Sequence, residues 1–361
     1  MSEPAVNADA EQVGDPAAVT SAAAARGPLI MEAAGLNKVF RLGRGASLQA
    51  VRNVSFGLYQ GAVVALVGES GSGKSTVAKL LAGQEQPTSG QVLLRGQPVD
   101  VRGGRAFRAY KAAVQYVFQD PFSSLNPVHT VGYTLTRPVK LHQRDVRDVK
   151  GAVTALLEQV RLTPAAQYRA KYPHELSGGQ RQRVSFARAL AAQPAVLLAD
   201  EPVSMLDVSI RLEMLNLLDD LRTRLALALL YITHDIASAR YFADEVLVMY
   251  GGQIVERGPA EEVTQRPAHP YTQLLVASAP DPDNLGSALK GGRAGLAGPG
   301  QARPAGSVGP AAAGCPFSSR CPLADDKCRR ENPALQPLSP ARAAACWRLD
   351  VAVPPPAAGA R

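Results

Sequence analysis

At the centre of the predicted architecture stands Gly68-Glu69-Ser70-Gly71-Ser72-Gly73-Lys74-Ser75-Thr76. The apolar run at 62–67 before it predicts a buried strand, and residues 77–81 after it predict a helix. The pattern G-x-x-x-x-G-K-[ST] between a strand and a helix is typical of a phosphate-binding loop. Its glycines let backbone N–H groups point inward, and the positive end of the helix favours anions. We expect Lys74 to reach the outer phosphates and the Ser75 hydroxyl to bind Mg²⁺. The alternative is a glycine-rich turn without a ligand, but the strand before the loop and the helix after it also match the phosphate-binding motif.

The length and composition of the chain limit what kind of protein it is. A chain of 361 residues has room for two or three compact units, and 46% hydrophobic residues support a sizeable core. No apolar run approaches the roughly 20 residues that span a bilayer. The acidic start of the chain lacks the basic and apolar regions of a signal peptide. We therefore expect the protein to be made and kept in the cytoplasm.

The formal net charge of +8 has more than one explanation. Nucleic-acid binding is one of them, but the basic residues are spread along the chain and aromatic residues make up only 5%. A solvated surface, or contact with anionic lipid headgroups and ATP, explains the charge equally well. We therefore predict no nucleic-acid partner.

Composition and periodicity divide the chain into successive parts. In order, these are a disordered leader (1–28), an α/β domain (29–280), a linker rich in Gly, Ala and Pro (281–314), a cysteine-containing extension (315–349) and a loose tail (350–361). Within the α/β domain, residues of about 120–190 predict a mainly helical subdomain, with a helix over 146–162 that begins at Asp145 as its N-cap. Strands are predicted at 30–41, 49–58, 62–67, 114–118, 195–199, 229–233, 245–250 and 253–256.

Polar side chains follow three of these strands directly. Asp200 and Glu201 come after the apolar run 195–199, where an α/β sheet presents its ligands. Asp200 is placed to hold Mg²⁺, and Glu201 is the candidate base that polarises an attacking water. His234 ends another buried strand and is placed to contact a γ-phosphate, whereas Gln119 is a candidate ligand of Mg²⁺ or water. These residues predict a catalytic centre for phosphate chemistry at one edge of the sheet.

A second anion-binding surface is predicted at Leu176-Ser177-Gly178-Gly179-Gln180, which opens a helix through Ala191. Ser177 is a suitable cap, and the paired glycines expose backbone N–H groups at the positive end of the helix. An ordinary glycine-containing cap is the alternative. Two phosphate sites at the edges of different subdomains, however, indicate that each ATP is held between two protomers.

These motifs resemble those of the nucleotide-binding subunit of ATP-binding cassette (ABC) transporters over residues 29–280. The resemblance implies a P-loop NTPase fold, in which a RecA-like core carries an antiparallel β subdomain and a helical subdomain. It also implies a head-to-tail pair of cassettes, in which ATP bound by one is covered by the other. Hydrolysis of the γ-phosphate then lets the pair reopen.

The resemblance assigns roles to individual residues. The ATP-binding residues are Phe40 (stacked on adenine), Gly68, Glu69, Ser70, Gly71, Ser72, Gly73, Lys74, Ser75, Thr76 and Gln119. The Mg²⁺ ligands are Ser75, Gln119 and Asp200, and the catalytic residues are Glu201 and His234. The residues that contact the ATP of the partner cassette are Ser177, Gly178, Gly179, Gln180 and Asp207.

Further segments resemble one group of ABC proteins, the oligopeptide and dipeptide importers. These segments are the extended loop at 119–127, His269-Pro270-Tyr271-Thr272 and the cysteine-containing extension. The resemblance implies a second, paralogous cassette subunit, two membrane permeases and, indirectly, an extracytoplasmic substrate-binding protein. The chain would then lie on the cytoplasmic face of the membrane as a peripheral subunit that powers peptide uptake. Nickel and glutathione importers share the pattern, so these cargoes stay open.

Two other classes of function fit the sequence less well. Soluble cassette proteins that act on nucleic acid or ribosomes usually carry two cassettes or a long coiled coil between the Walker motifs. The stretch from Lys74 to Asp200 has room only for the helical subdomain. A non-catalytic scaffold would not need Glu201 and His234. An ATPase bound to a permease is therefore the preferred interpretation.

Four cysteines lie in the extension, with the spacing C-x5-C-x6-C-x17-C. This spacing lacks the C-x2-C pairs of structural zinc sites, and four thiolates suit a [4Fe–4S] cluster. The resemblance to importers with such an extension supports an iron–sulfur cluster on Cys315, Cys321, Cys328 and Cys346, in a structural or redox-sensing role. Zinc and unliganded cysteines are the alternatives.

Overall fold

The computed structural model describes residues 27–42, 46–100, 103–120, 124–143, 145–279 and 314–352. The predicted leader, linker and tail lie outside these ranges, apart from residues 27–28, 314 and 350–352. Residues 121–123 of the predicted Gln119 loop also lie outside them. The described residues form two sheets and the helices around them, which confirms the predicted α/β class.

The larger sheet has the strand order β11-β12-β10-β9-β3-β8-β7-β6. Its members are β3 (Val63–Val67), β6 (Val114–Val117), β7 (Val196–Asp200), β8 (Ala228–Thr233), β9 (Glu245–Tyr250), β10 (Gln253–Pro259), β11 (Gln336–Ser339) and β12 (Arg342–Ala344). Neighbouring strands from β9 through β6 run parallel, and every residue of β3, β7, β8 and β9 is buried. Their nearly continuous apolar sequences are those expected of strands that are covered on both faces.

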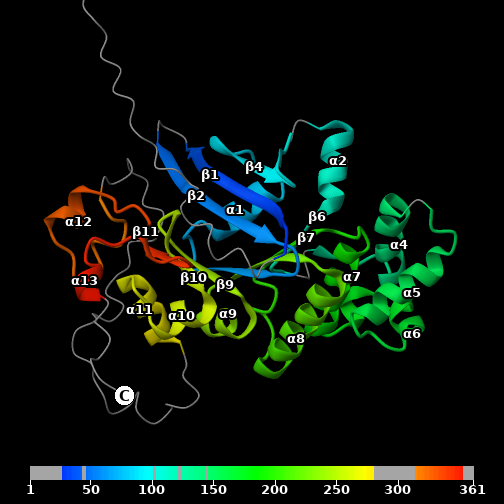
Figure 1. The fold of residues 1–361 in the computed structure, drawn as a ribbon. Coiled ribbons are helices and arrows are strands. Elements are labelled where there is room, and N and C mark those ends of the chain that lie inside the picture. Colours follow the sequence, from blue (N-terminus) through cyan, green and yellow to red (C-terminus); the bar gives the residue numbers. More distant parts are fainter. Residues whose placement is uncertain are drawn as a thin grey trace, which may run out of the picture.

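A smaller antiparallel sheet, β2-β1-β4-β5, lies above the larger one in Figure 1. Its strands are β1 (Leu29–Arg41), β2 (Ser47–Tyr59), β4 (Ser89–Leu94) and β5 (Gln97–Pro98). Helix α1 (Lys74–Leu81) packs in one apolar cluster with both sheets, through residues such as Val77 and Leu81. The side chains of β3 alternate between this cluster and the helices on the opposite face.

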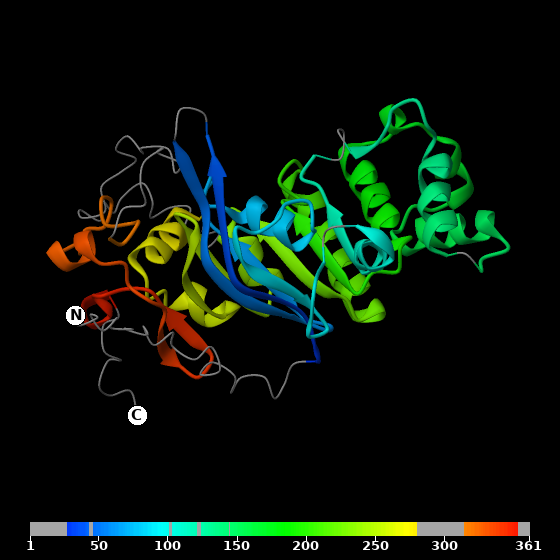
Figure 2. The same ribbon diagram turned by 90° about the horizontal axis from the view of Figure 1, so that it is seen from above.

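The helices form two groups, one gathered at an end of the molecule and the other placed along the larger sheet (Figures 1 and 2). One group is the helical subdomain of α4 (Val131–His142), α5 (Val149–Gln159), α6 (Ala165–Ala170) and α7 (Gly178–Leu190). The other helices are α2 (Gly104–Ala113), α8 (Val208–Leu225), α9 (Ile236–Phe242), α10 (Ala260–Gln265) and α11 (Pro270–Ser278). Within the described ranges, no helix combines enough length with enough apolar character to cross a bilayer.

The predicted N-cap of α5 is wrong by three residues. Asp148, rather than Asp145, caps the helix, and its carboxylate accepts a hydrogen bond of 2.8 Å from Gly151 N. Both aspartates suit a cap, so residue type alone does not separate them.

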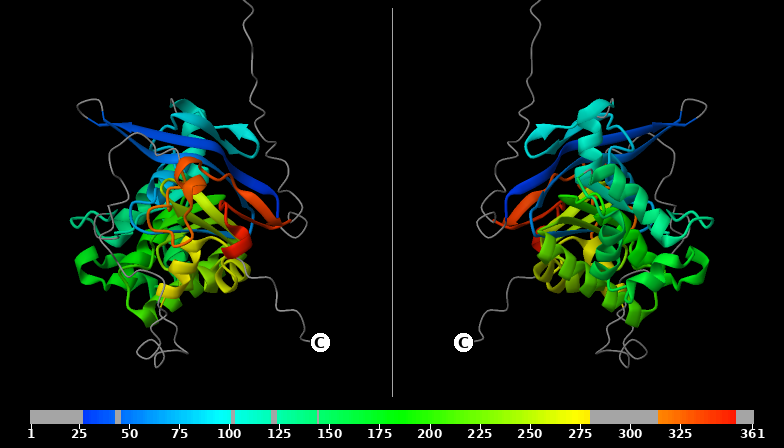
Figure 3. Two further views of the ribbon diagram at one scale, coloured as in Figure 1. Left: turned by 90° about the vertical axis from the view of Figure 1, so that its left-hand side faces the viewer. Right: turned by 90° about the vertical axis from the view of Figure 1, so that its right-hand side faces the viewer.

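The C-terminal extension is joined to the larger sheet. It contains α12 (Asp326–Arg330), β11, β12 and α13 (Leu349–Ala352). Strand β12 pairs with β10 in antiparallel register, with Glu256 opposite Ala344. Figure 3 shows the extension, orange to red, against this end of the sheet. The extension therefore continues the core sheet beyond the cassette.

A buried carboxylate fastens this junction. Glu256 on β10 is fully buried and forms an ion pair of 2.7 Å with Arg342 Nη2 on β12. Its oxygens also accept hydrogen bonds from Ala268 N (2.9 and 3.1 Å) and His269 N (2.8 Å). One side chain thus ties together β10, the entry to α11 and the extension.

The buried His269 predicts a pH dependence of stability. Its Nδ1 caps α11 by accepting from Tyr271 N at 3.0 Å, and burial lowers its pKa from 6.5 to about 4. Between these values the unfolded chain binds a proton that the folded chain does not. The contribution of His269 to the free energy of unfolding is therefore fully present above about pH 6.5. It is lost as the pH decreases toward 4, by about 3 kcal/mol.

Urea unfolding at a series of pH values measures this effect. His269→Asn keeps a capping acceptor but does not titrate, so we expect a flatter stability profile between pH 6.5 and 4. Equal pH slopes for the variant and the wild type would contradict the assignment to His269.

Candidate functional site

The phosphate loop connects β3 to α1 and requires glycine at two close approaches. A Cβ atom at Gly68 would lie 2.2 Å from Met249 O, and one at Gly73 would lie 2.3 Å from Ala50 O. Gly73 also has φ of 105°, a region that L-residues rarely adopt. The loop is therefore closed tightly between β9 and β2, as a loop of inward-pointing N–H groups must be.

Lys74 is buried within this loop. Its ammonium donates hydrogen bonds to Gly68 O at 2.7 Å and Glu69 O at 2.9 Å. Burial lowers its pKa, and the negative charges of Glu201, Asp200 and Glu69 oppose that shift. A buried cation that bonds to backbone carbonyls can exchange these partners for phosphate oxygens, which carry full charge.

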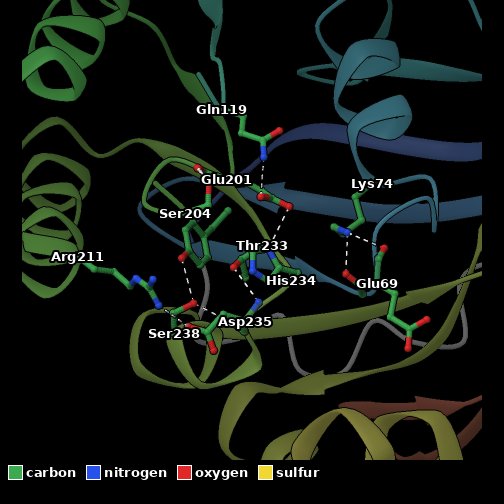
Figure 4. Close-up of polar contacts among 12 residues, drawn as sticks. Glu69, Lys74, Gln119, Glu201, Ser204, Arg211, Thr233, His234, Asp235 and Ser238 are labelled. Carbon is green, nitrogen blue, oxygen red and sulfur yellow. Dashed lines mark hydrogen bonds and ion pairs between the residues drawn. The ribbon is translucent and has the colours of Figure 1, made fainter. Parts of the chain in front are cut away.

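Glu201 lies where strands β6, β7 and β8 end at one edge of the larger sheet. Its carboxylate accepts a hydrogen bond from Gln119 Nε2 at 2.9 Å, and its other oxygen lies 3.2 Å from His234 Nδ1. Figure 4 shows Glu201 between these two side chains, with Lys74 across from them. The structure thus brings together four residues that the sequence predicted to act together.

Asp200 presents one oxygen that suits a divalent cation. Its Oδ2 accepts a hydrogen bond of 2.6 Å from Tyr116 OH, whereas its buried Oδ1 has no hydrogen-bond partner among the described residues. A buried carboxylate oxygen normally has a partner, and carboxylate and hydroxyl oxygens are ligands that Mg²⁺ prefers. Asp200 therefore has the chemistry of a Mg²⁺ ligand, and Ser75, the other predicted ligand, is exposed at the start of α1.

The residues predicted to contact the ATP of a partner cassette lie on other elements than the phosphate loop, at the starts of α7 and α8. Ser177 is exposed and caps α7 in a capping box, in which its Oγ accepts from Gln180 N and its N–H donates to Gln180 Oε1. A Cβ at Gly179 would lie 2.9 Å from Ile210 Cγ2, so a larger residue would have to displace this side chain of α8. Asp207, at the N-cap of α8, is also exposed.

Phe40, the predicted adenine contact, lies near the end of β1. It is half-buried, and Lys38 Nζ lies 4.8 Å from the centroid of its ring. Its role toward a nucleotide therefore stays a prediction.

Two residues near the phosphate loop were not predicted. Tyr271 OH accepts a hydrogen bond of 2.8 Å from Glu69 N, and Arg320 of the extension forms an ion pair with the Glu69 carboxylate. Tyr271 belongs to the His-Pro-Tyr-Thr segment that the sequence marked as a family feature. Nothing in the sequence around Arg320 indicated this contact.

The prediction of a [4Fe–4S] cluster in the extension is wrong. All four cysteines are free thiols, and the described residues contain no group of His, Cys, Asp and Glu that suits a metal ion. The cavity that they line together measures about 10 Å³, room for one water molecule at most. Burial raises the pKa of each thiol, that of Cys315 to about 11, which disfavours the thiolates that metals bind. The fold brings the four cysteines to one cavity, but the described residues form no metal site there.

Comparisons with known proteins agree on a family. The ABC transporter family model matches residues 51–204, and the model for the oligopeptide/dipeptide transporter C-terminal region matches residues 255–328. A probable peptide ABC transporter ATP-binding protein of Sinorhizobium fredii is 44% identical over 303 residues, which cover 83% of this chain and 82% of that protein. A dipeptide transport ATP-binding protein of Haemophilus influenzae is 36% identical over 329 residues, which cover 89% and 97%. A dimeric ATP-binding cassette in a post-hydrolysis state, bound to ADP and Pi, superposes with a TM-score of 0.57 at 26% identity and covers 64% of this chain and 99% of that one.

Proposed function

Because this chain belongs to the ATP-binding proteins of peptide-type ABC transporters, we propose that it binds and hydrolyses ATP to power peptide uptake through a membrane permease. The observation that carries the proposal is the Glu201 carboxylate, held by Gln119 and His234 across from Lys74. The peptide-transport names of the relatives favour peptides over nickel or glutathione as cargo.

In the proposed reaction, each residue at the sheet edge has a distinct role. Lys74 and the loop N–H groups bind the β- and γ-phosphates, and Glu201 orients the attacking water and accepts its proton. Gln119 and His234 hold that carboxylate in place, and His234 also contacts the γ-phosphate in the proposed complex. Asp200 and Ser75 would hold Mg²⁺, which supplies neutralisation of the charge on the transferred phosphoryl group.

We further propose that a second cassette completes the site. The helix start at 177–180, where Ser177 is exposed, offers a positive dipole end to an anion. Within this chain Ser177 and Gln180 bond to each other, and Gln180 Nε2 also donates to Tyr168 OH. The dimeric state of the cassette compared above supports a pair of cassettes, which we propose to be head-to-tail. We propose a paralogue as the partner and a peripheral position on the cytoplasmic face, with two permeases and, indirectly, a substrate-binding protein.

A basic groove beside Gln119 is the proposed contact with the permease. It lies between α2 with β6 on one side and α4 on the other, and exposed Phe118, Tyr133 and Leu141 give it apolar positions. Its basic residues are Arg105, Arg108, Lys111, Arg137, Lys140 and Arg188. A permease segment that carries acidic and apolar side chains would complement this groove. Because β6 leads directly to Gln119, such a segment would sense the state of the catalytic edge.

Reversing the charge of the groove tests this assignment. In a complex coexpressed with its permeases and sister cassette, Arg108→Glu with Arg137→Glu is expected to reduce the copurified permease about tenfold. The matched control is Lys150→Glu with Arg240→Glu, two exposed basic residues outside the groove. Equal recovery of permease with both double variants would exclude the groove as the contact. Failure of the wild-type chain to copurify with any permease would contradict the proposed function itself.

A further inference from the structure

Glu69 of the phosphate loop forms hydrogen bonds through its backbone carbonyl, its backbone N–H and its side-chain carboxylate. Its carbonyl accepts from Lys74 Nζ at 2.9 Å, and its N–H donates to Tyr271 OH at 2.8 Å. Its carboxylate accepts two hydrogen bonds from Arg320, at 2.8 and 3.1 Å. Two of these three partners lie outside the strand and helix that flank the loop, and one belongs to the C-terminal extension.

Arg320 is itself fixed by its surroundings. Its guanidinium lies 5.9 Å from the ring centroid of Tyr250 and 5.7 Å from that of Phe317. Phe317 is buried and packs against Tyr250 and Tyr271, with ring centroids 5.3 and 5.5 Å apart. The extension therefore brings Arg320 to the loop, and the packed rings of Tyr250 and Phe317 beside its guanidinium limit the conformational freedom of this long side chain.

The charge of Glu69 makes this contact important for a nucleotide. Its carboxylate is part of the loop that receives a triphosphate, and like charges repel across a partly buried site. Arg320 neutralises that carboxylate. The two N–H groups of its planar guanidinium bind both oxygens of Glu69 and so orient the carboxylate toward the extension. The hydrogen bond with Glu69 raises the pKa of Arg320 above its usual range, so the cation is permanent.

We propose that Arg320 is a positioning residue for the phosphate loop, which raises nucleotide affinity by pairing with Glu69 and turning its carboxylate away from the bound phosphates. This inference rests on the proposed function, because it assumes that the loop binds ATP. It gives the extension a direct role at the nucleotide site of its own chain.

Nucleotide affinity in a double-mutant cycle tests the proposal. Arg320→Ala is expected to weaken the binding of Mg-ATP and Mg-ADP about threefold to tenfold, with a larger effect on KM than on kcat. In the Glu69→Gln background, the same replacement is expected to change affinity less than twofold, because no carboxylate is left to neutralise. The effect of Arg320→Ala should also shrink in high salt, since the pair is partly exposed.

Two controls separate positioning from a merely structural role. Arg329→Ala removes an exposed arginine of the same extension, which pairs with Asp326, and should leave affinity unchanged. Arg320→Lys keeps the charge but not the fork, and should restore part of the affinity. Equal losses from Arg320→Ala with and without Glu69→Gln would overturn the proposal, as would unchanged affinity. Absence of Mg-ATP binding by the wild type would instead contradict the proposed function.

Discussion

Glu201→Gln is expected to lower kcat for ATP hydrolysis by about 10²- to 10⁴-fold while ATP binding survives. Glutamine retains the shape and hydrogen-bonding oxygen of the side chain, but it does not accept a proton from water at neutral pH. The partners of Glu201 can therefore stay in place, and the contacts of Lys74 with the nucleotide do not involve the replaced group. Steady-state turnover and equilibrium ATP binding measure the two properties separately.

The same variant tests the proposed pairing of cassettes. With the γ-phosphate retained, the Glu201→Gln protein should accumulate as a dimer with its sister subunit in saturating Mg-ATP, which light scattering detects. Glu158→Gln, an exposed carboxylate on α5, is the matched control and should hydrolyse ATP normally. Undiminished turnover in Glu201→Gln would remove this residue from its role. A persistent monomer, even beside the membrane partners, would contradict closure by ATP.

Glu256→Ala is expected to destabilise the protein by about 3–5 kcal/mol, because it leaves Arg342 buried without its partner. It also removes the acceptor for Ala268 N and His269 N, which are both buried. The midpoint of thermal or urea unfolding measures this loss, and the strands of the extension should exchange their amide protons faster than β3 or β8.

Two further variants make the cause of that loss specific. Glu256→Leu combined with Arg342→Met removes both charges, and it should destabilise the protein less than Glu256→Ala alone. Glu261→Ala replaces an exposed carboxylate on the adjacent helix and should change stability by less than about 1 kcal/mol. A loss below that value for Glu256→Ala would show that the buried pair does not hold the extension.

The cassette could be predicted from its sequence because its signals are local. Apolar runs such as 195–199 and 229–233 have the composition of strands buried on both faces, and each is followed at once by a polar residue with a proposed role in catalysis. Parallel strands bring their carboxyl ends to one edge, so the meeting of Glu201, His234 and Gln119 follows from topology. The glycine pattern of the phosphate loop is also a local signal, because a Cβ atom at Gly68 or Gly73 would collide with the backbone of a neighbouring strand.

The remaining features depend on contacts between residues far apart in the chain. Short strands β11 and β12 have little periodicity, and they are defined by pairing, β12 with β10 and β11 with β12. Glu256 and Arg342 resemble ordinary charged residues until the fold buries them together. The cysteines illustrate the opposite error, since a spacing that suited a cluster belongs to free thiols, two buried and two partly buried, around a cavity of about 10 Å³.

The pairing of β12 with β10 has a consequence for biosynthesis. Without the extension, β10 would present an open row of backbone donors and acceptors, a surface on which other chains can polymerise. Strands β11 and β12 follow the cassette in the chain, so this border stays uncapped until residues 336–344 have been synthesised and have left the ribosome. Once docked, they leave only the short β11 at the border, and its Pro337 lacks a donor for a further strand. Premature termination before residue 314 would therefore yield a cassette with an open sheet edge, which favours aggregation.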